Sequence, residues 1–254
     1  MSKKVQTDEM TTDAGASFLH VGPPLEKGAL PSLFYFALSA KDSLTLDPFN
    51  QIVQFLANEP FRIFSVTLPA HENNLSPINA MNVWAELTQK GEDFISKFVL
   101  SAKDVIDTVI KRNLSTKKIA AAGLSRGGFM ASHLASQDPR VKSLLSFAPL
   151  VDLSYTKEFE LLKDHPYVQK TKLSNLKDML YDRKIRFYIG NRDRRVGTDQ
   201  SFKTLTAFVE KAFENKIRTS EIELYVTPSI GHMGHGTSSE IFEQGAKWIQ
   251  KQLL

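Results

Sequence analysis

Apolar residues fall into two alternating patterns along the chain. Short unbroken apolar runs, such as 33–38, are typical of buried strands, and longer segments with apolar residues at helical spacing, such as 239–253, are typical of amphipathic helices. The predicted strands cover 33–38, 61–68, 118–122, 141–148, 185–190 and 222–227. The predicted helices cover 49–57, 79–112, which Gly91 could interrupt, 127–137, 201–215 and 239–253.

Strands that alternate with helices favour a mostly parallel sheet covered by helices on both faces. We therefore predict an α/β fold in a single domain over residues 1–254. Residues 1–30 are an irregular lead-in that could supply an edge hairpin. Residues 150–184, between the fourth and fifth predicted strands, are predicted as a small helical insertion that could cap a site. In such a sheet, ligands bind beyond the carboxyl ends of the strands.

The composition narrows the class of protein. Hydrophobic residues make up 42% and charged residues 24%, as in ordinary globular proteins. The net charge is +4, but basic and acidic residues are mixed, so we expect no nucleic-acid partner. The absence of cysteine excludes a disulfide or a thiolate nucleophile. Residues 1–16 lack the apolar stretch of a secretion signal and no apolar run is long enough to span a membrane, so we expect a soluble, cytoplasmic protein without a membrane partner.

The run Gly123-Leu124-Ser125-Arg126-Gly127 lies where a predicted strand ends and a helix begins. Flanking glycines let the neighbouring elements approach a sharp turn that exposes the serine hydroxyl, as in a nucleophile elbow. The alternative is that Ser125 only caps the helix. A serine nucleophile needs a base, and the base needs an orienting acid.

Candidates for the acid and the base follow in order along the chain. Asp193 comes directly after the fifth predicted strand, at the same end of the sheet as Ser125, and Asp199 is its nearest rival. Asp193 could also be a solvated residue paired with neighbouring arginines. After the sixth strand come His232 and His235, one of which is predicted to be the base. The shorter distance from the strand favours His232 slightly, whereas glycines on both sides of His235 could free its backbone to present the ring.

This order of strand-Gly-x-Ser-x-Gly-helix, strand-Gly-x-x-Asp and strand-Gly-His resembles the α/β-hydrolase superfamily. The Ser-Arg-Gly-Gly run at 125–128 and the insertion are most similar to dienelactone-hydrolase-like and prolyl-oligopeptidase-like serine hydrolases, here without a propeller. The resemblance implies an oxyanion hole formed by the Arg126 amide and by an amide near Leu38 or Ser39. The His-Gly pair that often begins the second of these loops is missing from 36–41.

The sequence therefore predicts a serine hydrolase of the α/β-hydrolase fold that cleaves a small carboxylic ester or thioester through an acyl-enzyme. No cofactor or metal is expected. A serine peptidase is one alternative, although nothing in the sequence suggests a domain that gates peptides. A non-catalytic binding protein built on the same fold is another, since the His-Gly pair is absent.

Overall fold

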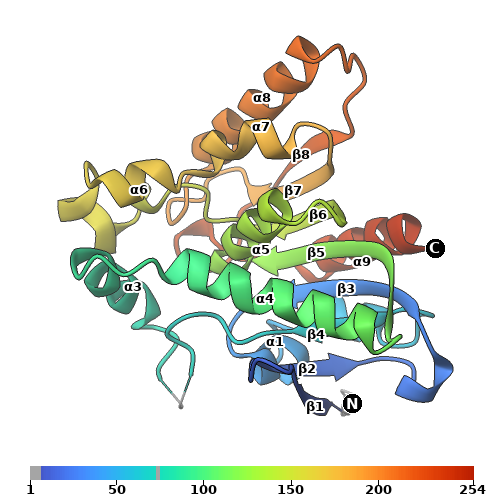
Figure 1. Ribbon diagram of the computed structural model, residues 1–254. Helices are drawn as coiled ribbons and strands as arrows, with labels where there is room; N and C mark the ends of the chain where they lie inside the picture. The colour runs from blue at the N-terminus through green and yellow to red at the C-terminus, as the bar shows by residue number, and fades with distance from the viewer. Residues whose placement is uncertain (1–6, 73–74) are drawn as a thin grey trace.

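A single sheet forms the centre of the molecule, and it explains how distant parts of the sequence meet (Figure 1). The computed structural model describes residues 7–72 and 75–254, so the first six residues of the expected lead-in lie outside the described residues. Within the described residues, the strands are β1 (Asp8–Thr11), β2 (Ser17–Val21), β3 (Leu30–Phe36), β4 (Arg62–Ser65), β5 (Ser115–Leu124), β6 (Val141–Phe147), β7 (Lys184–Gly190) and β8 (Ile222–Thr227). They lie in the order β1-β2-β4-β3-β5-β6-β7-β8.

The strands from β3 to β8 are parallel, and β1 and β2 form an antiparallel hairpin at the edge beside β4. The predicted mostly parallel sheet is therefore confirmed. All six predicted strands match an observed strand, and the lead-in supplies the edge hairpin. Parallel strands end at the same edge of a sheet, so the loops after β5, β7 and β8 meet at one end of the molecule.

Helices cover both faces of the sheet (Figure 1). The α-helices are α1 (Ala40–Thr45), α2 (Gln51–Leu56), α3 (Ala80–Gln89), α4 (Phe94–Lys111), α5 (Arg126–Gln137), α6 (Pro166–Lys170), α7 (Lys177–Leu180), α8 (Thr198–Glu214) and α9 (Ser239–Leu253). Short 3-10 helices are η1 (Leu25–Lys27), η2 (Leu153–Tyr155), η3 (Lys157–Leu162), η4 (Leu173–Leu176) and η5 (His232–Gly234). The predicted helix over 79–112 is two helices, because the chain turns at Gly91 with a φ of 74°.

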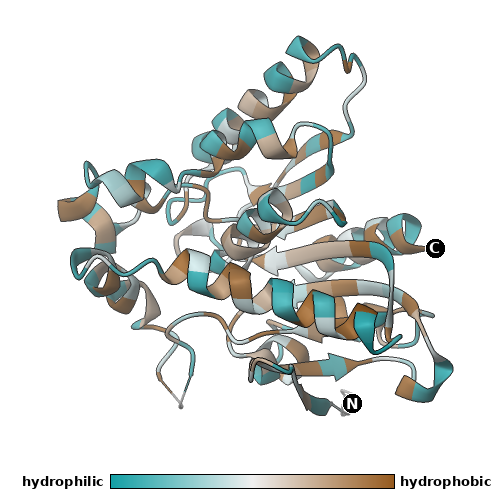
Figure 2. Cartoon of the chain, viewed as in Figure 1, coloured by the Kyte–Doolittle hydropathy of each residue, from teal (hydrophilic) through white to brown (hydrophobic). Residues whose placement is uncertain are grey.

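Alternate residues of the strands feed the two halves of the core. Phe34 and Phe36 of β3 pack with the helices from α3 to α5, whereas Leu33 and Tyr35 face α2 and α9. The helices match this arrangement, and in Figure 2 bands of brown and teal alternate along α4. In the described part of the chain, no helix has both the length and the apolar character needed to cross a membrane.

Candidate active site

Ser125 occupies the sharp turn between β5 and α5. Its φ of 54° and ψ of −117° lie in a region that residues with a side chain rarely adopt. The turn is held from both sides, because the Ser125 amide donates to the Phe147 carbonyl at 2.8 Å and the Ser125 carbonyl accepts from the Leu150 amide at 3.1 Å. Such strain persists only where the surrounding structure enforces it, and it gathers at functional sites.

The two glycines of the motif permit contacts that no side chain would allow. A Cβ on Gly123 would lie 2.2 Å from the carbonyl carbon of Gly127. A Cβ on Gly127 would lie 1.9 Å from the carbonyl oxygen of Phe36, the last residue of β3. The start of α5 therefore rests directly on the ends of β5 and β3, and any residue other than glycine would push Ser125 out of place.

Two successive hydrogen bonds connect the side chains of Ser125, His235 and Asp193. The Nε2 atom of His235 lies 2.9 Å from the Ser125 Oγ, and its Nδ1 atom lies 2.7 Å from Oδ2 of Asp193. An ionised carboxylate only accepts, so the Nδ1–H of His235 donates to Asp193. The lone pair of Nε2 then accepts a hydrogen bond from the Ser125 hydroxyl, which is the arrangement that a general base requires.

Asp193 is fixed in place by the loop that follows β7. The side chain is buried, and its Oδ1 atom accepts hydrogen bonds from the amides of Arg195 at 2.9 Å and Val196 at 3.0 Å. Together with His235, these donors compensate the cost of removing a carboxylate from water. Asp199, the rival candidate, lies in the first turn of α8, where its carboxylate accepts from Lys203 Nζ at 3.2 Å on the surface.

The slight preference for His232 is not supported by the geometry, because the structure brings His235 to Ser125. Three residues of this loop, Gly231, Met233 and Gly234, have positive φ values, and the Gly236 amide donates to the Ile230 carbonyl at 2.8 Å. The loop therefore folds back on itself, so a greater distance in sequence from β8 does not place His235 farther from Ser125. His232 is exposed.

Amides near the end of β3 differ in their availability for an oxyanion. The Leu38 amide donates to the Ser43 Oγ at 3.0 Å, and the Ala37 amide donates to the same oxygen. Leu38 is thus a poor candidate for this role. No described residue accepts a hydrogen bond from the amide of Ser39 or from that of Arg126, the two other predicted donors. An oxyanion hole needs backbone N–H groups that are free to donate to the oxyanion, and within the described part of the chain the amides of Ser39 and Arg126 meet this requirement.

Ser43 was not among the residues predicted from sequence. Its helix, α1, begins after Ser39, whose Oγ accepts from the Asp42 amide at 3.0 Å. A Ser-x-x-Asp pattern of this kind marks the start of a helix, and this signal in the sequence could have identified α1. Ser43 then follows as a residue of the first turn.

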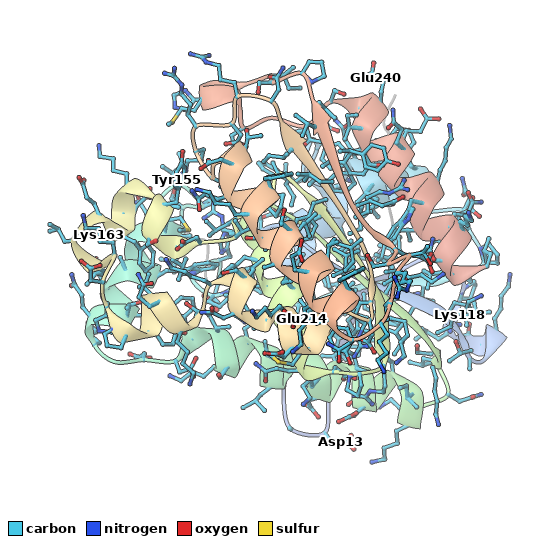
Figure 3. All side chains as sticks on the ribbon, turned by 90° about the horizontal axis from the view of Figure 1, so that it is seen from above. Asp13, Lys118, Tyr155, Lys163, Glu214 and Glu240 are labelled. Atoms are coloured by element: carbon cyan, nitrogen blue, oxygen red, sulfur yellow. The ribbon has the colours of Figure 1, made fainter. Side chains whose placement is uncertain are left out.

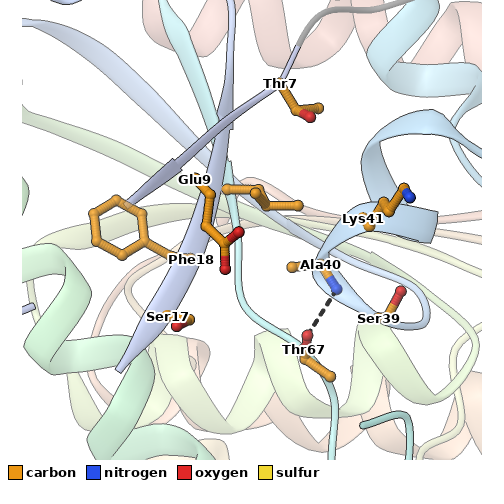
Figure 4. A pocket seen from close by; sticks show the side chains of 9 residues that line it. Thr7, Glu9, Ser17, Phe18, Ser39, Ala40, Lys41 and Thr67 are labelled. Atoms are coloured by element: carbon orange, nitrogen blue, oxygen red, sulfur yellow. Dashed lines mark hydrogen bonds between the residues drawn. The ribbon is translucent and has the colours of Figure 1, made fainter. Parts of the chain in front are cut away.

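A hollow of about 430 Å³ lies between the edge hairpin of β1 and β2 and the start of α1, and residues 39–41 line it (Figure 4). It contains none of the predicted nucleophile, base or acid residues. On its wall, the Ala40 amide donates to the Thr67 Oγ1 at 3.0 Å, drawn as a dashed line in Figure 4. This bond ties the loop after β3 to the loop after β4 and holds Ser39 at the end of the sheet where Ser125 lies.

A larger cleft of about 770 Å³ is lined by Arg126, the residue after Ser125, and by Arg194 and His232, which neighbour Asp193 and His235 in their loops. Ser125, Asp193 and His235 are not among its lining residues. Its walls come from Arg126, from the loops that carry Asp193 and His235, and from residues 154–163 of the insertion. Tyr155 and Lys163, two residues of its wall, are labelled on the same side of the molecule in Figure 3. Within residues 7–72 and 75–254, no group of three or more histidine or acidic side chains is placed to hold a metal ion.

The comparison with family models gives a match over residues 84–254 with the prolyl oligopeptidase family. This range is more than half of the chain, and it includes Ser125, Asp193 and His235. No curated protein sequence matches the chain.

Solved structures share the fold over nearly the whole chain. TT1662 from Thermus thermophilus is 17% identical, with a TM-score of 0.68 and 98% of each chain covered. The esterase Pf2001 from Pyrococcus furiosus is 16% identical, with a TM-score of 0.64, and the match covers 98% of this chain and 91% of the esterase. The acylaminoacyl peptidase of Pyrococcus horikoshii is 14% identical, with a TM-score of 0.64, and the match covers 98% of this chain but 41% of the peptidase. The fold is thus the α/β-hydrolase fold expected from the sequence.

Proposed function

Because the chain belongs to the prolyl oligopeptidase family of serine hydrolases, we propose that it hydrolyses a carboxylic ester or thioester with Ser125 as nucleophile, His235 as base and Asp193 as orienting acid. The observation that carries this proposal is the pair of hydrogen bonds through His235, at 2.9 Å to Ser125 and 2.7 Å to Asp193. The strained turn at Ser125 supports it further, since a serine that merely caps a helix has no need of a positive φ.

The proposed reaction has two halves. The Ser125 Oγ attacks the carbonyl carbon of the ester while Nε2 of His235 accepts its proton, and the amides of Arg126 and Ser39 stabilise the oxyanion. His235 then donates the proton to the leaving oxygen or sulfur as its bond to the carbonyl carbon breaks, so that the alcohol or thiol departs and the acyl group stays on Ser125. In the second half, His235 activates a water molecule that releases the acid from Ser125. Asp193 stabilises the imidazolium in both halves.

An ester is proposed before a peptide as substrate, because the region similar to this chain is nearly the whole of an esterase but less than half of a peptidase. The chain corresponds to 91% of the Pyrococcus furiosus esterase and to 41% of the Pyrococcus horikoshii acylaminoacyl peptidase. A peptidase remains the second candidate, because the matching family model is named for oligopeptidases. A binding role without catalysis would not require the aligned Oγ, Nε2 and Nδ1–H groups.

The proposal is tested with a fluorophosphonate probe, which reacts with an activated serine and needs no knowledge of the substrate. We expect the wild-type protein to be labelled at Ser125 and to hydrolyse short aryl esters. Ser125→Ala should abolish labelling and lower kcat/KM for these esters by about 10⁴-fold or more. Ser136→Ala in the same helix is the matched control. Labelling that survives Ser125→Ala, or a wild-type protein that is neither labelled nor active, would refute the assignment.

A further inference from the structure

Positive side chains outnumber negative ones on the walls of the cleft that Arg126 lines. Two carboxylates, those of Glu158 and Glu160, face a larger set of cationic side chains on its walls. The cationic residues are Arg126, Lys157, Lys163, Arg194 and Arg195. A cleft of one dominant sign concentrates ligands of the opposite sign, but surface lysines alone specify none. The geometry of Arg126 is more specific.

Arg126 lines the cleft and directly follows the proposed nucleophile in sequence. Its Nη1 atom donates to the Pro77 carbonyl at 2.9 Å, which fixes the group in one orientation. No described residue accepts a hydrogen bond from Nε or Nη2 of Arg126. These two nitrogens form the edge of a guanidinium that binds a carboxylate through two parallel hydrogen bonds.

Glu158 lies near enough to influence Arg126 but is bound by another residue. Both of its oxygens accept hydrogen bonds from Arg195, at 2.8 Å and 2.9 Å. Burial and the neighbouring Arg195 lower the pKa of Arg126 to about 10, although Glu158 acts in the opposite direction. Arg126 therefore stays charged at neutral pH, and an anion placed against it would offset both the loss of water and the repulsion from Arg195.

We propose that the Nε–Nη2 edge of Arg126 binds a carboxylate on the substrate, so that the preferred substrates are carboxylic esters or thioesters with an acidic group on the acyl or the alcohol part. This inference rests on the proposed function and adds the substrate class to it. The acidic group must be close to the scissile carbonyl, because Arg126 directly follows Ser125. Acyl groups of the size of succinyl or glutaryl fit this requirement.

The test compares esters that differ only in charge. One pair is 4-nitrophenyl hemisuccinate and its methyl ester, which places the carboxylate on the acyl part. The other pair is 4-acetoxybenzoate and its methyl ester, which places it on the leaving group. In at least one pair, we expect the wild-type protein to favour the anionic ester in kcat/KM by about 10-fold or more. Arg126→Met should bring this ratio close to 1. Arg126→Lys, which keeps the charge but not the paired donors, should give an intermediate ratio.

The ratio is taken within each variant, so a change in the chemical step affects both esters and cancels. Lys163→Gln is the control for diffuse charge, since it removes one positive charge from the same cleft. If Lys163→Gln lowers the ratio as much as Arg126→Met, or if Arg126→Met leaves it unchanged, the assignment to Arg126 is wrong. A wild-type protein that is labelled by fluorophosphonate but shows no preference in either pair overturns only this inference. Failure of labelling and hydrolysis together overturns the proposed function.

A second measurement needs no variant and remains informative if Arg126→Met does not fold. Succinate should slow fluorophosphonate labelling of the wild-type protein, whereas dimethyl succinate at the same concentration should not. Equal protection by inorganic phosphate would contradict the assignment to carboxylates and identify a general anion site. The absence of protection by succinate would also count against the proposal.

Discussion

Arg62 and Arg126 lie at opposite ends of the sheet, and their guanidinium groups have different surroundings. Arg62 begins β4 at the amino end of the parallel strands and is fully buried. It donates to the backbone carbonyl oxygens of Pro23, Pro24, Leu25, Gly28 and Leu114. Arg126, at the carboxyl end, donates to one carbonyl among the described residues, that of Pro77.

The comparison shows which end of the sheet has hydrogen-bond donors available to a ligand. At the amino end, every nitrogen of Arg62 has a carbonyl partner, so the side chain joins the lead-in to the chain before β5 and is not available to a ligand. At the carboxyl end, Arg126 lines a cleft and directly follows Ser125, whose backbone is strained. Substitutions at the carboxyl end should therefore reduce activity, whereas substitutions at the amino end should reduce stability.

The largest expected effect at the carboxyl end is that of His235→Ala. Removing the base leaves the Ser125 hydroxyl without a proton acceptor, so kcat/KM for aryl esters and the rate of fluorophosphonate labelling should fall by about 10⁴-fold or more. His232→Ala is the matched control from the same loop, and it should retain labelling within about threefold, because His235 and not His232 is hydrogen-bonded to the Ser125 Oγ. The reverse result would show that the loop rearranges to present His232.

Asp193→Asn should have the next largest effect. The amide would leave the imidazole in the wrong tautomer, and loss of an orienting acid elsewhere lowers kcat by about 10⁴-fold. The loop should stay folded, because the side-chain oxygen of the introduced asparagine can still accept from the amides of Arg195 and Val196, as Oδ1 of Asp193 does. Asp199→Asn is the control, and its kcat should stay near that of wild type. Equal loss in the two variants would remove Asp193 from its assigned role.

How far the sequence could predict these results depends on the range of each signal. Ser125 and Asp193 each directly follow a predicted strand, which is a local feature, and the mostly parallel sheet follows from the alternation of strands and helices. The order of the strands in the sheet is seen only in the structure. The choice between His232 and His235 depends on a loop with three residues of positive φ, including Met233, and residue spacing does not encode that path.

Whether the Leu38 amide could serve as an oxyanion-hole donor depends on a contact that forms only in the folded protein. Its amide is engaged by Ser43, which reaches back from α1. The open edge of Arg126 likewise depends on Pro77, 49 positions earlier in the chain, and on the pairing of Arg195 with Glu158. Such long-range partners cannot be read from one local pattern.

At the amino end, Arg62→Met should destabilise the protein without altering the chemistry. Several buried carbonyl oxygens would lose their donors, and we expect the free energy of unfolding to fall by about 3 kcal/mol or more. Urea denaturation measures this loss. Lys117→Met, at an exposed position near the same end of β5, should change stability by less than about 0.5 kcal/mol. Folded Arg62→Met should still be labelled by fluorophosphonate. A variant that is stable but not labelled would contradict the idea that the amino end contributes to stability and the carboxyl end to activity.

The smallest expected effect concerns the buried histidines outside the site, and it appears only as the pH falls. Burial lowers the pKa of His133 in α5 and of His71 to about 4 in each case, and it lowers the pKa of His20 as well. The unfolded chain takes up protons on the rings of His71 and His133 near the ordinary histidine pKa of about 6.5, whereas the folded protein does not until the pH nears 4. Stability is therefore complete above pH 6.5 and is lost as the pH falls toward 4.

Each of His71 and His133 should lower the free energy of unfolding by up to about 2 kcal/mol between pH 7 and pH 5. Urea denaturation at the two pH values measures the difference, which His133→Gln should reduce by removing one titrating ring. Met130→Leu, a buried change in the same helix, should alter stability at both pH values by a similar amount and keep the difference. If His133→Gln leaves the pH dependence of wild type intact, then proton uptake by His133 on unfolding is not what weakens the protein in acid.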